Sequence, residues 1–478
     1  MNKPLYVTSY DFRQAFDSLW IQDCILTLQR LGVENYILQL VYELNKKATF
    51  QVKTPFGLTE PTEVQDIVKQ GGILGSLICS ASTAEYCGIN KGIIMGDTQI
   101  ATLAYVDDIL DLNGNPRDTE VAHENAQVFA SKKKLEHTPE KCNIILINGK
   151  KKDVVPELYI KGERMKEVLT VVCLGDVFNS KGNNEDLVKD RVKRATASMI
   201  SIHGFMRETQ LGKHTISVYL ILHNAIFVAS ILFNAQAWSN ISDKNAEQIA
   251  VVQRKFLKQI LKAPPSTANS VVYLEMGIIP IKYEIHKRQL SFLHHIINLT
   301  EDDPVRKVWK HQSSSPDYKN WWTGVKDLLS KYSITFTEDQ IKEMSKESYK
   351  ERIKKAVKKV AFEELKTECS SKEKTKNLNY TELKTQEYMT NLYPNYARII
   401  FKCRSKTLNI KEYMQYKYKG ANCCRWCGIS DETLRHIVNC GSSGYNIDNI
   451  EEIIYGTDIH RMKEVAVRIE DFLEKVEV

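Results

Sequence analysis

The stretch TQIATLAYVDDILDLNGN, Thr98–Asn115, decides the fold of the first part of this 478-residue chain. Apolar residues lie on both sides of the acidic pair Asp107-Asp108, a pattern that predicts two short strands joined by a tight turn. Most Asp-Asp pairs are solvated turn residues. Here the apolar flanks indicate that the acids lie at the end of a buried strand, which suits a metal ion better than a core.

The sequence around this turn mixes strand and helix patterns without a strict strand-helix alternation. PLYVTSY, residues 4–10, predicts a strand that ends at Asp11. Further elements are predicted in chain order: helices at 21–32 and 34–45, a strand at 48–57, a helix within 71–82, a helix at 119–136, a strand at 141–149 and a hairpin at 171–183. This mixture predicts an α+β domain.

Asp11 and the pair Asp107-Asp108 are carboxylates in two separate strand-and-turn contexts. Two Mg²⁺ ions bridged by such carboxylates are what nucleotidyl transfer requires, because one ion activates a 3′-hydroxyl and the other neutralises the leaving pyrophosphate. Hard oxygen ligands on adjacent strands hold the ions about 3.5–4 Å apart.

Five motifs then resemble the reverse transcriptases of non-LTR (LINE-like) retrotransposons. They occur in the family's order, A to E, at DFRQAFD (11–17), QGGILGS (70–76), YVDD (105–108), TPEKC (138–142) and CLGDVF (173–178). One such motif is weak, whereas five in order are specific. The resemblance covers residues 1–300 and implies a polymerase palm followed by a helical thumb.

The resemblance also implies roles for single residues. Asp11 and Asp107 would be the principal Mg²⁺ ligands, with Asp108 as the second acid of its motif. The positions matched to nucleotide and template binding are the Phe12 backbone, the steric gate Phe16, Gln70, Gly71 and Tyr105. Lys141 matches a candidate general acid, although a solvated lysine is the simpler interpretation, and Leu174 and Gly175 match the primer grip. The chain departs from the family at Gly75-Ser76, where Ser-Pro is usual, which predicts looser template positioning.

Behind this domain the chain becomes helical and basic. Residues 1–130 hold 9 Lys/Arg and 16 Asp/Glu, a net charge of −7, and the remainder holds 57 and 43, a net charge of +14. The segment 184–203 has an apolar stripe, and its lysines and arginine lie off that stripe. This pattern matches a thumb helix whose cations contact phosphates, but it equally matches a solvated surface helix. An acidic front and a basic rear suit a metal centre followed by a surface for an anionic polymer.

A zinc site is predicted from Cys424-x2-Cys427-x8-His436-x3-Cys440, with Cys423 as an alternative to Cys424. Three thiolates and one imidazole make a closed, structural shell. The odd total of 11 Cys and their clustering argue against a disulfide framework. Just before this site, tyrosines and lysines alternate at Tyr413–Lys419, a pattern that fits base stacking or plain surface packing.

The apolar segment Ile216–Ala235 is long enough to span a membrane. His223, Asn224, Ser230 and Asn234 interrupt it, so a buried helix is the better prediction and no membrane partner is expected. The N-terminus has no continuous apolar signal region. The protein is therefore expected inside the cell, with nucleus and cytoplasm both open.

Four regions are predicted: a palm at 1–180, a helical thumb and connection at 181–300, a Lys-rich helical or linker region at 301–394, and a C-terminal zinc unit at 395–478. The family's fingers and endonuclease are not among them and are expected from a longer product, so the fragment is expected to polymerise poorly alone. The implied activity is RNA-directed DNA polymerisation from an RNA template, a DNA primer and deoxynucleoside triphosphates. The alternative is a non-catalytic nucleic-acid-binding remnant.

Overall fold

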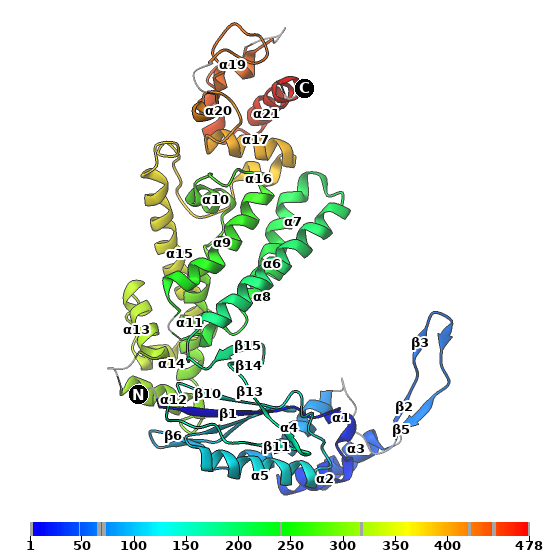
Figure 1. Ribbon diagram of the computed structural model, residues 1–478. Coiled ribbons are helices and arrows are strands. Elements are labelled where there is room, and N and C mark those ends of the chain that lie inside the picture. The colour runs from blue at the N-terminus through cyan, green and yellow to red at the C-terminus, as the bar shows by residue number, and fades with distance from the viewer. Residues whose placement is uncertain are drawn as a thin grey trace. The chain divides into compact units, whose positions relative to one another are not determined.

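The computed structural model describes the chain in two compact units. The described residues are 3–46, 48–64, 68, 73–239, 241–315, 319–418, 422–441 and 446–476. Unit 1 comprises Met1–Leu187 and Thr300–Tyr318, and unit 2 comprises Val188–Leu299 and Lys319–Val478. Figure 1 labels the helices and strands of both units.

Unit 1 contains a five-stranded sheet in the order β13-β10-β1-β9-β8. Its strands are β1 (Leu5–Tyr10), β8 (Thr102–Tyr105), β9 (Asp108–Asn113), β10 (Asn143–Ile147) and β13 (Lys166–Glu167). The central strand β1 runs antiparallel to β9 and β10, with Tyr10 opposite Ile109 and Ser9 opposite Asn143. The end of β1 therefore lies beside the starts of β9 and β10, so residues flanking three distant strands meet at one edge.

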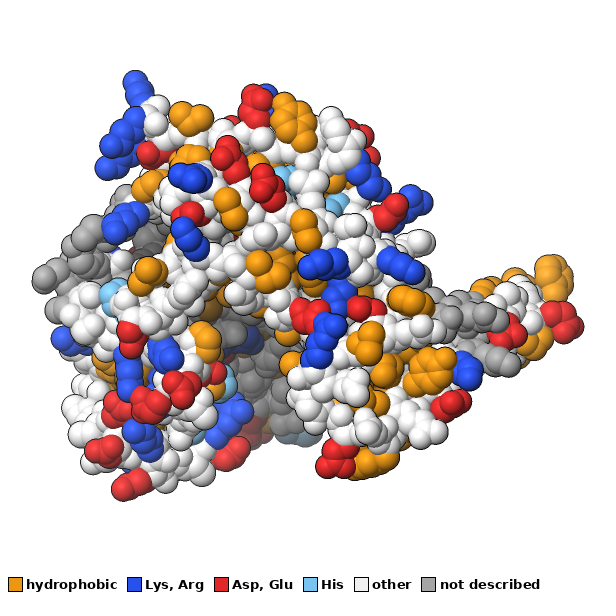
Figure 2. Space-filling view, turned by 90° about the horizontal axis from the view of Figure 1, so that it is seen from below, with side chains coloured by type: hydrophobic (Ala, Val, Ile, Leu, Met, Phe, Trp, Pro, Cys, Tyr) orange, Lys and Arg blue, Asp and Glu red, His pale blue; other side chains and the backbone are white. Residues whose placement is uncertain are grey.

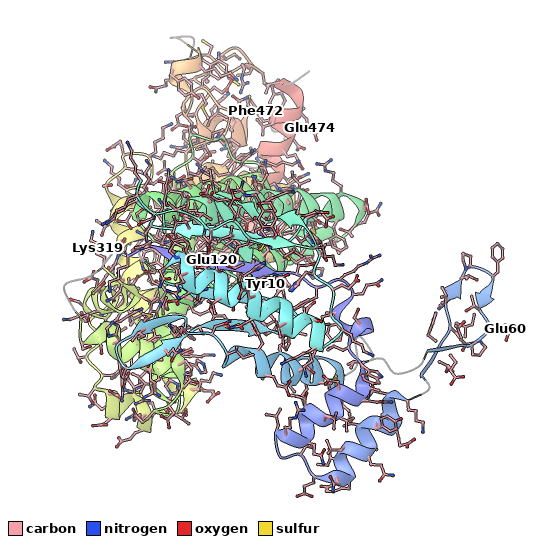
Figure 3. All side chains as sticks on the ribbon, turned by 60° about the horizontal axis from the view of Figure 1, so that its bottom comes forward. Tyr10, Glu60, Glu120, Lys319, Phe472 and Glu474 are labelled. Carbon is pink, nitrogen blue, oxygen red and sulfur yellow. The ribbon has the colours of Figure 1, made fainter. Side chains whose placement is uncertain are left out.

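Alternate residues of these strands feed two cores, as the period of two along a strand requires. Tyr10, Ile109 and Ile144 belong to the larger core, which is covered by the helices α2 (Ile21–Arg30), α4 (Ile73–Cys87) and α5 (Pro116–Lys132). Figure 3 shows Tyr10 on the face along which α5 runs, where its hydroxyl hydrogen-bonds His123 of α5 at 3.1 Å. Val7, Leu110, Ile145 and Val171 form a smaller core on the opposite face.

The other elements of unit 1 are short. They are α1 (Ala15–Ser18), α3 (Asn35–Asn45), β2 (Ala48–Phe50), β3 (Lys53–Thr54), β4 (Gly57–Leu58), β5 (Thr62–Val64), β6 (Ile93–Met95), β7 (Thr98–Ile100), β11 (Tyr159–Ile160), β12 (Glu163–Arg164), β14 (Thr170–Cys173), β15 (Asp176–Asn179) and α12 (Pro304–Ser313). Strands β2 to β5 form an arm whose end carries exposed hydrophobic side chains, visible in orange in Figure 2; Phe56 there is fully exposed. The expectation of a mixed sheet-and-helix domain is confirmed.

Helices are the regular elements of unit 2 among its described residues, joined by irregular segments and two isolated β-bridges. Its longer helices are α6 (Glu185–Glu208, which starts in unit 1), α7 (Thr215–Leu222), α9 (Asp243–Ile260), α10 (Asn269–Met276), α11 (Ile281–Ile297), α13 (Trp321–Lys331), α15 (Lys346–Ser370), α17 (Pro394–Arg404) and α21 (Ile459–Val476). The shorter ones are η1 (Gly212–His214), η2 (His223–Val228), α8 (Ala229–Ile231), η3 (Ala235–Ala237), α14 (Glu338–Glu343), α16 (Glu387–Asn391), α18 (Gln415–Tyr418), α19 (Leu434–Asn439) and α20 (Ile450–Tyr455). In α6 the expected stripe is buried at Val188, Ala195, Met199 and Ile202 and half-buried at Val192.

Within the region 301–394, which was predicted as helical or linker, the segment 371–386 has an irregular backbone but is not a loose linker. Leu378, Tyr380 and Leu383 are buried, and Tyr380 donates a hydrogen bond of 2.6 Å to Glu275 of α10. The preceding helix α15 buries Tyr349, Ile353 and further residues along one face. The four-region division of the sequence stays a prediction beside these two units.

Within the described residues, the stretch Gly212–Ile231 is long and apolar enough to cross a membrane by length and composition, and 28% of it is buried. A core helix without membrane contact passes the same test. His223, Phe227 and Ile231 are buried, whereas Ile221 is 63% and Ile226 44% exposed. The expected burial therefore holds for one face of this helix only.

Candidate active site and cysteine-histidine cluster

The three aspartates lie at one edge of the unit 1 sheet. Asp11 directly follows β1, and the register that pairs Tyr10 with Ile109 places it opposite Asp108, the first residue of β9. Asp107 lies in the turn between Tyr105 and Asp108, which are paired across β8 and β9. Val106, the first turn residue, has φ of 60°, an unusual and strained value for a β-branched side chain. The expected strand-turn-strand at this motif is confirmed.

These carboxylates influence one another electrostatically. Burial raises the pKa of the Asp108 carboxyl, and the negative charges of Asp107 and Asp11 raise it further. Oδ1 of Asp11 is inaccessible to solvent and accepts no hydrogen bond among the described residues. The edge of the sheet therefore has excess negative charge, with one buried carboxylate oxygen outside any hydrogen bond of good geometry.

Lys141 supplies a positive charge at the same edge. Its Nζ lies 3.3 Å from Oδ1 and 3.4 Å from Oδ2 of Asp11, 130 residues away in sequence. A tight turn closed by hydrogen bonds from the Lys141 and Cys142 N–H groups to the Thr138 carbonyl places it there. The lysine is 67% exposed, so its ammonium can turn toward solvent or a ligand.

Sequence reasoning missed Cys142, which fixes the backbone at Asp11. The Asp11 N–H donates to Cys142 Sγ at 3.4 Å, and the thiol lies 3.7 Å from the Asp11 carbonyl. Burial raises the pKa of this thiol to about 11, so it remains protonated near neutral pH. Its position directly after Lys141 was the only available signal.

The positions matched to nucleotide binding differ in exposure. Hydrogen bonds from Arg13 N to Glu136 O and from Thr138 N to Asp11 O flank Phe12, so the Phe12 carbonyl points away from that neighbouring segment. The Phe12 ring is buried and stacks on His137 with ring centroids 4.8 Å apart. Phe16 is half-buried against the larger core, and Tyr105 is 64% exposed.

Of the QGGILGS motif at 70–76, the structure describes residues 73–76. Gln70 and Gly71 fall outside the described residues. Gly75 and Ser76, where a looser loop was expected, lie in the first turn of α4, with Gly75 buried. The departure from the family pattern therefore falls within a helix rather than before it.

Leu174 and Gly175 form the two-residue turn between β14 and β15. Both have positive φ, 46° and 81°, as a type I′ hairpin turn requires. Gly175 adopts this conformation freely, whereas Leu174 does so at a cost. The expected hairpin is confirmed.

Cys424, Cys427, His436 and Cys440 converge in unit 2. Their ligand atoms lie within 4.8 Å of one another, close enough to hold a metal ion. Cys424 Sγ is 3.8 Å from Cys440 Sγ, and Cys427 Sγ is 3.3 Å from His436 Nε2. Among the described residues no other group of three or more ligand atoms lies this close together, and the three aspartates at the sheet edge do not either. Their separation is expected, because like charges repel when no cation lies between them.

Cys423 does not take part in this cluster. It is exposed and pairs in an isolated bridge with Asp431, whereas Cys424 is buried. Backbone N–H groups of Ser430 and Ile429 lower the pKa of the Cys427 thiol to about 6, which favours the thiolate that binds metals. The structure thus selects Cys424 as the fourth member of the group.

An ion pair that the sequence did not reveal fixes the loop around the cluster. The buried Glu432 carboxylate accepts hydrogen bonds from Arg425 at 2.7–3.1 Å, and these bonds lower its pKa although burial opposes this. Of the three tyrosines proposed for base stacking, Tyr413 is buried and Tyr418 packs against the Arg425 guanidinium. Only Tyr416 is largely exposed, at 73%, so the stacking interpretation does not hold for Tyr413.

Residues 1–181 match the family model "Reverse transcriptase (RNA-dependent DNA polymerase)". The chain is 26% identical over 196 residues to a retrovirus-related Pol polyprotein from the type-1 retrotransposable element R2 of Nasonia vitripennis, covering 38% of this chain. It spans only 19% of that relative's length.

Solved telomerase structures also align with the chain. The telomerase of Candida tropicalis with a fragment of telomeric RNA gives a TM-score of 0.33 at 13% identity, covering 74% of this chain and 49% of that one. The Candida albicans telomerase gives 0.30 at 12%, with the same coverage. Alignments this weak support no argument about the fold. The family match, the relative and the ordered motifs thus make residues 1–181 similar to reverse transcriptases, and the relative is a retrotransposon polyprotein.

Proposed function

We propose that this chain is the RNA-directed DNA polymerase of a non-LTR retrotransposon and joins deoxynucleotides to a primer 3′-hydroxyl on an RNA template. The observation that carries the proposal is the meeting of Asp11, Asp108 and Lys141 at one edge of the sheet, with Asp107 in the adjoining turn. Acids and a cation from distant motifs meet there, as phosphoryl transfer requires.

The donor set fits Mg²⁺. Asp11, Asp107 and Asp108 offer hard carboxylate oxygens, the Phe12 carbonyl points away from its neighbouring segment, and the buried Asp11 Oδ1 has only the Lys141 ammonium nearby, outside hydrogen-bond geometry. Two bound ions would activate the attacking hydroxyl and neutralise the departing pyrophosphate.

The remaining residues act by position and charge. The Lys141 ammonium, held 3.3 Å from Asp11, can approach the departing phosphate and supply a proton or a positive charge. The half-buried Phe16 ring would exclude a ribose 2′-hydroxyl, and the turn at Leu174-Gly175 would contact the primer. Gln70, Gly71 and Tyr105 are proposed for nucleotide and template binding.

We further propose that Cys424, Cys427, His436 and Cys440 hold a structural Zn²⁺. With a Zn–S bond of about 2.3 Å, tetrahedral geometry places two thiolates about 3.8 Å apart, and the measured Cys424–Cys440 separation is 3.8 Å. Four protein ligands leave no open position, which favours a structural over a catalytic metal. The proposed location is intracellular, with nucleus and cytoplasm both open, and no membrane partner is proposed.

Primer extension tests the polymerase proposal. The chain is incubated with an RNA template, a labelled DNA primer, Mg²⁺ and four deoxynucleotides, beside an Asp107→Ala/Asp108→Ala variant. Extension should fall by at least about 100-fold in the variant, because preorganised charge at the reacting phosphate is lost. Extension that persists in the variant would contradict the proposal, and binding of the template-primer without extension by the unmodified chain would favour the non-catalytic binding protein.

A further inference from the structure

A strongly basic recess lies between α11 and α15 in unit 2. It has a volume of about 470 Å³ and is lined by Gln236, Lys287, Arg288, Ser291, Phe292, His295, Lys346, Lys350 and Lys354. Five of these side chains are cationic at neutral pH and none is acidic. We name this set the α11–α15 groove.

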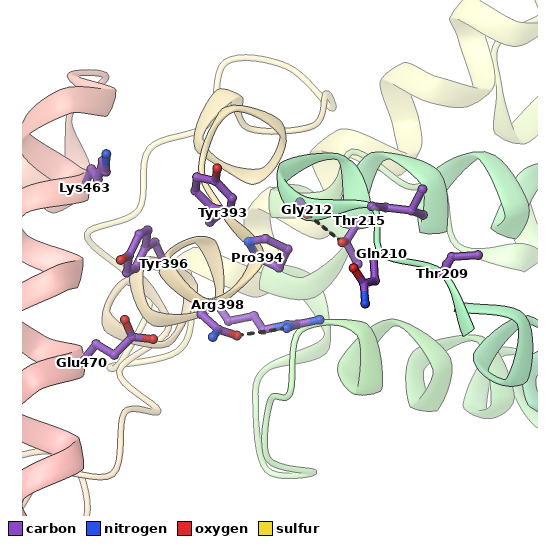
Figure 4. A pocket seen from close by; sticks show the side chains of 12 residues that line it. Thr209, Gln210, Gly212, Thr215, Tyr393, Pro394, Tyr396, Arg398, Lys463 and Glu470 are labelled. Atoms are coloured by element: carbon purple, nitrogen blue, oxygen red, sulfur yellow. Dashed lines mark hydrogen bonds between the residues drawn. The ribbon is translucent and has the colours of Figure 1, made fainter. Parts of the chain in front are cut away.

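Two other recesses of unit 2 have mixed charge. Figure 4 shows one of about 580 Å³, where Arg398 and Lys463 share the lining with Glu470. Another, of about 610 Å³, combines three lysines and Arg254 with Asp243, Glu247, Glu364 and Glu368. The α11–α15 groove differs from both because its own lining does not neutralise its cations.

The cations of the groove follow two regular helices. Lys346, Lys350 and Lys354 recur every four residues along α15, which spaces them about 6 Å apart along one face. Lys287 and Arg288 lie about two turns before His295 on α11. Cations in register along a groove match the repeating charge of a polynucleotide backbone better than a single small anion.

Two of these lysines are free to bind. Lys346 and Lys350 are exposed and make no ion pair among the described residues. Lys287 pairs with Glu284 on its own helix, Lys354 lies 3.4 Å from Glu351, and the Arg288 guanidinium donates to the Leu232 carbonyl at 2.7 Å. The free charge therefore concentrates at the start of α15.

Phe292 adds an aromatic surface to this basic groove. It is half-buried, and its ring lies edge-on to Trp321 with centroids 5.8 Å apart. An aromatic ring among backbone-binding cations is the arrangement that stacks unpaired bases. A base-paired duplex does not offer such a face along its length.

The walls of the groove are rigid. On α15, Tyr349 and Ile353 are fully buried, and the Tyr349 hydroxyl donates to the Leu290 carbonyl of α11 at 3.2 Å. His294 Nε2 hydrogen-bonds the Met344 carbonyl at 2.9 Å. The cations are thus presented by packed helices rather than by a loop that would have to order on binding.

We propose that the α11–α15 groove binds a single-stranded polynucleotide, with Lys346, Lys350 and Arg288 at phosphates and Phe292 against a base. This binding site goes beyond polymerisation, since it needs neither the aspartates of unit 1 nor a deoxynucleotide.

The test measures binding by fluorescence anisotropy without Mg²⁺ or deoxynucleotides. The probes are fluorescein-labelled oligouridylate and oligothymidylate, with the corresponding duplex and poly-glutamate as further arms. The main variant is Lys346→Glu/Lys350→Glu. Its matched control is Lys355→Glu/Lys359→Glu, which makes the same charge change at exposed positions on the opposite side of α15.

The groove variant should bind the single strands roughly 10- to 30-fold more weakly at about 0.15 M salt, with the slope of log K against log salt reduced by about 1.4, because two phosphate contacts are lost. The control should bind as the unmodified chain does. Phe292→Leu, which keeps the apolar volume, should weaken single-strand binding and leave duplex binding unchanged. A preference between the two single strands identifies RNA or DNA as the ligand, and either supports the proposal.

Three results would overturn it. Equal weakening in the groove variant and its control would mean that diffuse charge binds the probe. Unchanged binding by Phe292→Leu would remove the base contact. Poly-glutamate binding as tightly as the oligonucleotides would point to an acidic protein instead. Asp107→Ala/Asp108→Ala should bind normally, so failure of the polymerase proposal is distinguishable from failure of this one.

Discussion

Glu275 is the residue whose replacement should damage unit 2 most. Its carboxylate is fully buried on α10 and accepts hydrogen bonds from Tyr380 at 2.6 Å, Tyr388 at 2.8 Å and Arg404 at 2.7 Å. These partners come from the irregular segment before α16, from α16 itself and from α17. One carboxylate therefore joins four parts of the helical unit.

The expected magnitude follows from what Glu275→Gln leaves behind. In this variant Arg404, which is 5% exposed, loses its carboxylate partner and keeps the hydrogen bond from its guanidinium to the Ile454 carbonyl at 2.8 Å. Removing one partner of a buried ion pair costs about 3–5 kcal/mol, because the other charge stays desolvated. We expect the free energy of unfolding of unit 2 to fall by about this amount.

Urea denaturation followed by circular dichroism measures the loss, and hydrogen exchange locates it. Amides of α10 and α17 should exchange faster in Glu275→Gln. Glu382→Gln is the control, since its ion pair with Lys384 is exposed at both ends, and it should leave the unfolding curve unchanged.

A second replacement separates the charge from the packing. If the unpaired guanidinium causes the loss, Glu275→Gln/Arg404→Met should be no less stable than Glu275→Gln alone. The reasoning is refuted if Glu275→Gln costs less than about 1 kcal/mol, or if the double variant loses the sum of the two single losses.

Three further predictions concern pH, the hairpin turn and the metal cluster. Burial lowers the pKa of His223 and of His286 to about 4, so as the pH falls the unfolded chain takes up protons before the folded chain does. The stability of the folded state should be complete above about pH 6.5 and fall toward pH 4 by up to about 3 kcal/mol for each histidine. Urea midpoints that do not change over this pH range would contradict the prediction. Leu174→Gly should stabilise the hairpin by about 1 kcal/mol, because φ of 46° strains leucine and not glycine; a lower melting temperature would show that the leucine side chain contributes more than the strain costs. Cys440→Ser should abolish tight zinc binding, measured by a chromophoric chelator, whereas Cys423→Ser should retain it; equal zinc content in both variants would disprove the ligand assignment.

The local sequence pattern predicted the main parts of unit 1 well. The apolar runs around Asp107-Asp108 are paired strands, and the hairpin at Leu174-Gly175 is present. Such features depend on side-chain alternation and turn chemistry within a few residues. The Cys-x2-Cys and His-x3-Cys spacings likewise bring their side chains together through local backbone geometry.

Contacts between distant residues could not be predicted in this way. Lys133 lies in a run of three lysines that reads as a solvated segment, yet it is buried and bonds Asp23 at 2.7 Å and Glu85 at 2.8 Å. Tyr413 has the sequence context of an exposed tyrosine and is part of the core. Periodicity gives the face of an element, but burial depends on which other element covers that face.

The sequence alone determined the order of the motifs, and with it the resemblance to reverse transcriptases and the acids of the candidate metal site. Local spacing also determined which cysteines and which histidine could share a metal ion. Tertiary structure decided that Lys141 lies beside Asp11, that Cys424 rather than Cys423 joins the cluster, and that lysines of α15 meet Phe292 of α11 in one groove. These depend on side chains from distant segments, whose meeting is fixed by the packing of whole helices and strands rather than by any short stretch of sequence.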